Sequence, residues 1–81
     1  MIKLSEKSRK LLEKCLRESN PELISIVNDP SVSNYSPDFY NRLRDYVGDE
    51  FIRNGLKSDF EPNEYGLRLE SLIDEIGNLF F

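Results

Sequence analysis

The sequence predicts an all-α fold, a compact bundle of three to four short helices in a single domain over residues 1–81. Apolar residues recur at spacings of three and four in several segments, which is the period of a helix with one buried face. Proline, glycine and asparagine separate those segments. A chain of 81 residues is one small domain, and the short connections between its segments suit a bundle.

The first predicted helix covers residues 5–19, with Ser5 as its N-cap. One face carries leucines and small residues: Leu4, Ser8, Leu11, Leu12, Cys15, Leu16 and Ser19. The opposite face is basic and gathers Lys3, Lys7, Lys10, Lys14 and Arg17. This helix should bury its leucines and expose its cations.

The second predicted helix is short, residues 21–28, with Asn20 as its cap and Pro21 at its first position. It would bury Leu23, Ile24 and Val27. The run from Leu23 to Val27 is rich in β-branched residues, so a strand remains an alternative for residues 22–27.

The third predicted helix covers residues 37–54, capped by Ser36 and followed by a core stripe of Phe39, Leu43, Tyr46 and Val47. Gly48 costs about 1 kcal/mol relative to alanine in a helix interior. An unbroken helix also places Glu50 within the apolar stripe. Both observations predict a kink or break near Gly48. At the end of the helix, Gly55 suits the left-handed position of a Schellman motif.

The fourth predicted helix covers residues 63–77 and has the most regular apolar stripe, formed by Tyr65, Leu69, Leu72, Ile73 and Ile76. Leu79 and Phe80 continue the stripe, so we expect Phe80 to dock onto the body of the protein, with a homodimer contact or a partner pocket for the terminal phenylalanines as the alternative. Phe81 should point away from the stripe.

Composition excludes several classes of protein. The only cysteine is Cys15 and there is no histidine, so neither an internal disulfide nor a zinc site is expected. A lone thiol favours a reducing, cytoplasmic compartment. The N-terminus lacks the apolar segment of a signal peptide, and no apolar run is long enough to span a membrane. We therefore expect a soluble protein without membrane association.

Catalytic chemistry has little support. Without histidine there is no imidazole base or triad, and Cys15 falls on an apolar face where thiols are usually inert. The segment 59–70 approximates the ligand spacing of an EF-hand calcium loop, but Glu64 stands where that loop needs glycine. We expect no enzyme activity, no cofactor and no metal site.

Charge is unevenly distributed along the chain, which has a net charge of −4. Residues 1–17 carry a net charge of +4, whereas residues 58–81 carry six acids and one base. Exposed acids around aromatic anchors are typical of proteins that bind basic partners. The predicted partner-binding residues are Tyr35, Phe60, Glu61, Glu64, Tyr65, Leu67, Glu70 and Asp74. The leading hypothesis is a non-catalytic module that regulates or inhibits a basic partner protein, for example an immunity or antitoxin-type inhibitor.

Two other functions stay open. A homo-oligomeric assembly domain would pair the basic first helix with the acidic fourth helix of a neighbouring copy. Nucleic-acid binding through the first helix is the weaker alternative, because no aromatic residue is interleaved with the bases and the whole chain is acidic. The plain structural interpretation is that the basic face is solvated or is paired with the protein's own fourth helix.

Overall fold

The computed structural model describes residues 1–80, which form four helices. These are α1 (Glu6–Ser19), α2 (Glu22–Val27), α3 (Pro37–Asn54) and α4 (Glu64–Gly77). The described part of the chain contains no strand, only an isolated bridge between Leu56 and Pro62. The predicted all-α bundle is confirmed, with every helix end within one residue of its expected position.

Local sequence determines where three of the helices begin. The side chains of Ser5, Ser36 and Asn63 accept hydrogen bonds from the backbone N–H groups three residues ahead, at 3.2, 3.2 and 2.7 Å. Such caps satisfy N–H groups that have no partner within the helix. The capping roles expected for Ser5 and Ser36 are confirmed.

Residues 22–27, for which a strand was the alternative, form the short helix α2. Leu23 and Val27 lie one turn apart and are both buried, whereas Ile26 is exposed. The backbone N–H of Ile2 donates to the Val27 carbonyl at 2.8 Å, which ties the N-terminal segment to this helix. The expected cap is wrong: the Asn20 side chain donates instead to the Tyr46 hydroxyl at 3.2 Å, and Pro21 precedes the helix.

The break expected near Gly48 does not occur, because α3 is a single helix from Pro37 to Asn54. The carboxylate that argued for the break, Glu50, is indeed buried. It is accommodated by the Tyr65 hydroxyl, which donates to it at 2.6 Å, and by the Asn54 amide at 3.0 Å. A buried charge with such partners is tolerated inside an apolar stripe.

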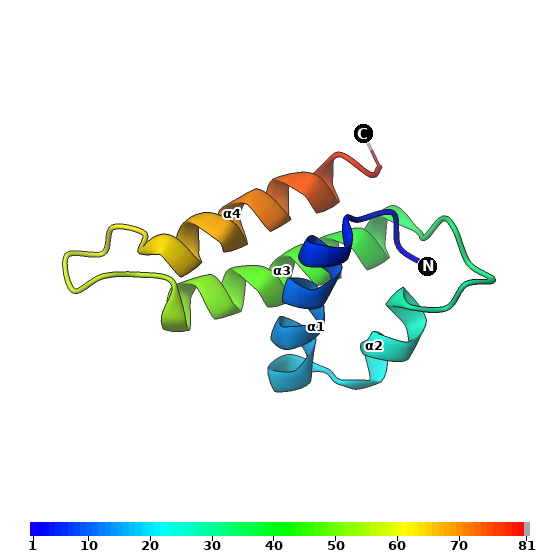
Figure 1. Cartoon of the computed structure of the whole chain (residues 1–81), viewed down its shortest axis with the longest axis horizontal. Helices are drawn as coiled ribbons and strands as arrows, with labels where there is room; N and C mark the ends of the chain where they lie inside the picture. Colours follow the sequence, from blue (N-terminus) through cyan, green and yellow to red (C-terminus); the bar gives the residue numbers. More distant parts are fainter. Residues whose placement is uncertain (81) are drawn as a thin grey trace.

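The helices pack as an antiparallel hairpin of α3 and α4, crossed steeply by α1, with α2 beside α1 (Figure 1). The connection between α3 and α4 projects from one end of the molecule, which measures 43 × 25 × 22 Å, and the N-terminus lies toward the other end. The buried core comprises Ile2, Leu12, Cys15, Leu16, Leu23, Val27, Tyr40, Leu43, Val47, Leu69, Leu72 and Ile76. None of the helices in residues 1–80 has the length and apolar content needed to cross a bilayer.

Phe80 docks onto the body of the protein as expected. Its ring stacks on Tyr40 with centroids 5.3 Å apart, close to the start of α3. The expectation for Phe81 concerns a residue outside the described part of the chain. The contact of Phe80 with Tyr40 therefore closes the end of the hairpin opposite the connection.

Glycines allow α3 and α4 to approach closely at the connection. A Cβ atom on Gly66 would lie 2.1 Å from the carbonyl oxygen of Gly55, and one on Gly55 would lie 3.0 Å from the Gly66 Cα. Gly55 has φ of −97°, so the left-handed Schellman conformation expected there is wrong. Position 55 requires glycine because a side chain there would collide with Phe51 and with Gly66 of α4.

We expect Gly48→Ala to raise the free energy of unfolding by about 1 kcal/mol, the helix-propensity difference between the two residues. A Cβ at position 48 meets no atom within 4 Å, so the added methyl group introduces no clash. Chemical denaturation measures the effect.

Gly66→Ala is the matched control for that measurement. It should lower the free energy of unfolding by about 1–3 kcal/mol, since its methyl group forces the two helices apart. Equal stability of the two variants would contradict the close approach of α3 and α4.

Candidate functional site

The eight predicted partner-binding residues do not form one surface. Phe60 and Glu61 lie in the connection between α3 and α4, which we call the hairpin loop (residues 55–63). Glu64, Glu70 and Asp74 are exposed on α4. Tyr65 and Leu67 line a groove between α1 and α4. The remaining residue, Tyr35, precedes α3 and so lies at the other end of the hairpin (Figure 1).

Tyr35, one of the predicted partner-binding residues, makes several contacts within the fold. Its ring stacks on Phe39 with centroids 4.9 Å apart and meets Tyr40 edge-on at 5.8 Å. Its hydroxyl donates to the Ile26 carbonyl at 2.7 Å. Tyr35 therefore links α2 to the start of α3, because its ring and its hydroxyl both find partners within the fold.

The hairpin loop has a defined backbone conformation. The Asn63 N–H donates to the Gly55 carbonyl at 2.9 Å, and the Lys57 N–H donates to the Glu61 carbonyl at 2.7 Å. The Phe60 N–H closes the turn onto the Lys57 carbonyl at 2.9 Å. This pattern is that of a tight three-residue hairpin, in which the last turn residue adopts the left-handed conformation.

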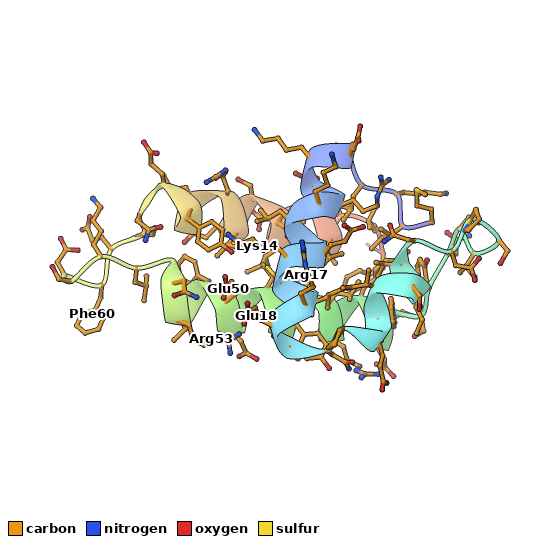
Figure 2. The ribbon with its side chains drawn as sticks, turned by 60° about the horizontal axis from the view of Figure 1, so that its bottom comes forward. Lys14, Arg17, Glu18, Glu50, Arg53 and Phe60 are labelled. Carbon is orange, nitrogen blue, oxygen red and sulfur yellow. The ribbon has the colours of Figure 1, made fainter. Side chains whose placement is uncertain are left out.

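Phe60 occupies that left-handed position, with φ of 65°. It is the one non-glycine residue with positive φ in residues 1–80, and its side chain is 82% exposed. Figure 2 shows its ring at the far tip of the molecule, away from the helices. A bulky residue in this conformation is strained, and turns of this kind normally place glycine there.

A second surface is the groove of about 600 Å³ between α1 and α4, which we call the basic groove. Its basic lining residues are Lys7, Lys10, Lys14 and Arg68. Leu11 from α1 and Leu67 from α4 add apolar surface, and the Leu67 side chain is 54% exposed. The groove therefore presents cations from two helices around an apolar strip.

The cations of this groove make no ion pair with α4 in the described structure, so of the two plain interpretations of the basic face, pairing with α4 is wrong. A solvated face is confirmed by the exposure of Lys7, Lys10 and Lys14. Within residues 1–80 no carboxylate lies within 4.0 Å of the charged groups of Lys7, Lys14 or Arg68. Lys10 pairs only with Glu6, on its own helix, at 3.4 Å. Between α1 and α4 the Ser8 hydroxyl donates a hydrogen bond to the Glu75 carboxylate at 2.9 Å. This contact involves one charged group and is therefore not an ion pair.

Lys14 and Arg68 instead contact the ring of Tyr65. The Lys14 Nζ lies 4.4 Å from the ring centroid and the Arg68 Cζ 5.8 Å, both within the range of a cation–π interaction. The hydroxyl of the same tyrosine donates to Glu50. Tyr65 therefore connects the surface charges of the groove to the buried carboxylate beneath it.

Glu50 remains ionised although it is buried. Burial by itself raises its pKa, but the hydrogen bonds from Tyr65 and Asn54 and the charges of Arg53 and Lys14 outweigh burial and hold the pKa below its ordinary value. Burial and the bond to Glu50 raise the pKa of Tyr65, so its hydroxyl stays protonated as the donor.

Cys15 lies in the core near this carboxylate. Burial, with the negative charge of Glu50, raises the pKa of its thiol to about 11. A neutral and fully buried thiol is a poor nucleophile. In residues 1–80 no three cysteine, aspartate or glutamate side chains are grouped so that they could hold a metal ion.

Two features were missed from the sequence. The spacing of Lys7, Lys10 and Lys14 identified a basic face, but Arg68 joins it only through the crossing of α1 over α4. Glu50 was recognised as a misplaced charge, yet its partner Tyr65 lies fifteen residues away on another helix. Neither the addition of Arg68 to the basic face nor the hydrogen bond of Tyr65 to Glu50 has a local sequence signal, because each depends on how the helices pack.

We expect Tyr65→Phe to lower the free energy of unfolding by about 1–3 kcal/mol near neutral pH, because it removes a hydrogen bond to a buried charge. The folded-state pKa of Glu50 is lowered, so the stability from its ionised form is present above the ordinary glutamate pKa and is lost as the pH falls through the folded-state pKa. The difference between the variant and the unmodified protein should therefore shrink in acid, as urea denaturation at several pH values would show.

Tyr46→Phe provides the control. The Tyr46 hydroxyl accepts from Asn20 and Arg42 and meets no carboxylate in the described structure. The effect of Tyr46→Phe on the free energy of unfolding should not shrink in acid. A pH-independent effect of Tyr65→Phe would contradict an ionised Glu50.

Comparison of the chain with protein-family models, with curated proteins and with solved structures finds no match. A function for this chain is therefore inferred from the geometry and chemistry of its own residues.

Proposed function

We propose that the protein is a non-catalytic binding domain that docks onto a basic partner protein through its hairpin loop and the acidic side chains beside it. Phe60 carries this proposal, because it is 82% exposed and held in a left-handed conformation. Immunity or antitoxin-type inhibition of a basic toxin or nuclease is one role that fits the size and charge of the chain.

The conformation of Phe60 brings the free protein no stabilisation. Its φ angle is strained and its ring contacts water rather than the core. Glycine or asparagine would occupy the same backbone position with less strain. A partner that buries the ring gives this residue a role, since large aromatic side chains are common anchors of interfaces.

The loop presents Phe60 in a fixed position. Hydrogen bonds within the loop hold the turn, and the close contact of Gly55 with Gly66 holds it against both helices. A preorganised anchor loses little conformational entropy on binding. The geometry therefore suits recognition by a rigid tip.

The charges near the tip are mostly negative. Asp59, Glu61 and Glu64 are exposed in the loop and at the start of α4, with Lys57 as the base among them. Glu70 and Asp74 extend the acidic surface along α4. Such a field attracts a positively charged protein and speeds its association, while the apolar ring supplies the buried contact.

We expect Phe60→Asn to raise the free energy of unfolding by about 1 kcal/mol, because asparagine tolerates left-handed φ, and yet to abolish partner capture. The capture experiment uses a photo-crosslinking phenylalanine analogue at position 60 in native lysate, followed by mass spectrometry. A basic protein should be crosslinked, and excess unmodified protein should compete where Phe60→Asn does not.

Ile52 supplies the matched control, since it is a 69% exposed apolar residue on α3, outside the loop. The analogue at position 52 should not crosslink the same protein, and Ile52→Ala should compete normally. Equal competition by Phe60→Asn and the unmodified protein would remove the loop from the interface.

A further inference from the structure

We propose that the basic groove is a second binding surface, which takes an acidic amphipathic helical segment of a partner protein. This inference goes beyond the proposed function, because the groove lies between α1 and α4 rather than at the hairpin loop and carries the opposite charge. It stands on the cations of the groove, of which only Lys10 makes an ion pair in the described structure, on their spacing and on the apolar strip between them.

The first support is the state of the charges. Lys7, Lys14 and Arg68 have no carboxylate partner in the described structure, although the chain as a whole is acidic. The one acid that lines the groove, Glu75, is hydrogen-bonded by Ser8. The groove therefore retains an excess of positive charge that an anionic ligand can neutralise.

The second support is the spacing of the cations. Lys7, Lys10 and Lys14 follow one another at three and four residues along α1, so they form a row about 10 Å long on one wall of the groove. Arg68 stands on the other wall. Carboxylates at spacings of three and four residues on a helical ligand repeat the same rise and can meet the row in register.

The third support decides between a peptide and other anions. Leu11 and the half-exposed Leu67 lie among the cations and need an apolar partner, which a phosphate group does not offer. The Tyr65 ring already has Lys14 at 4.4 Å and so is not free to stack on a nucleobase. Carboxylates beside leucine-like side chains satisfy both kinds of groove residue.

A second copy of the chain matches the groove less well. The acidic surface of α4 carries Glu64, Glu70 and Asp74, but its large exposed apolar side chain, Leu67, already lines the groove of its own molecule. The acids of the hairpin loop, Asp59 and Glu61, are only two residues apart and do not span the row of lysines. The groove chemistry therefore favours a different protein.

The test is selection of a displayed library of random peptides of about 15 residues, long enough for four helical turns, on the full chain. The double variant Lys7→Glu with Arg68→Glu serves for counter-selection. The selected peptides should be acidic and should carry apolar residues at spacings of three and four. Each single charge reversal should weaken their binding by about fivefold or more, and raised salt should weaken it further.

Arg42→Glu is the matched control, because Arg42 is an exposed cation on α3 that does not line the groove. It should change the affinity by less than about twofold. Phe60→Asn should leave peptide binding unchanged, so this result is independent of the proposed function of the hairpin loop.

Four outcomes would overturn the proposal. They are peptides without acidic enrichment, equal binding to the double variant, binding of inorganic phosphate or a single-stranded oligonucleotide at the groove in place of peptides, and self-association of the chain that the double variant abolishes.

Discussion

The hydrogen bond from Tyr65 to the buried Glu50 carboxylate is the interaction on which the rest of the structure depends. A buried carboxylate without partners destabilises a fold by several kcal/mol. Asn54 and Arg53 of α3 also partner this carboxylate, and Tyr65 is its partner from α4, so the Tyr65 hydrogen bond ties the register of α4 to that of α3. The contact of Gly55 with Gly66 lets the helices come close enough for that bond to form.

The same register places both proposed surfaces. Tyr65 satisfies Glu50 with its hydroxyl and holds Lys14 and Arg68 against its ring, so one side chain joins the buried charge to the basic groove. At the end of the hairpin, the chain leaves the two helices as a loop closed by a tight turn, and that turn presents Phe60. The molecule thus separates its charges, with cations in the groove where α1 crosses α4 and exposed acids in and beside the hairpin loop.

Local signals in the sequence were sufficient for three of the helices, whereas residues 22–27 could also have been a strand. Serine caps, prolines and apolar periodicity placed the helix ends within one residue. They failed where a distant residue decides the outcome. Gly48 and Glu50 together predicted a break, because nothing nearby in the sequence reveals that Tyr65 partners Glu50.

The predicted site shows the same limit. Phe60 and Tyr35 were both predicted to bind a partner. Phe60 is exposed in the structure, whereas Phe39, Tyr40 and the Ile26 carbonyl engage Tyr35. The basic groove was not predicted as a unit, since the contribution of Arg68 depends on a helix crossing.

The most direct test of the central claim is a pH titration of the Glu50 side-chain carboxyl by carbon NMR in the intact protein. An ionised, hydrogen-bonded Glu50 should titrate with a pKa below the usual glutamate value and show the shift of a carboxylate at neutral pH. A pKa above that value would mean that burial dominates, that Tyr65 does not donate to a carboxylate, and that the register of α3 and α4 has another origin.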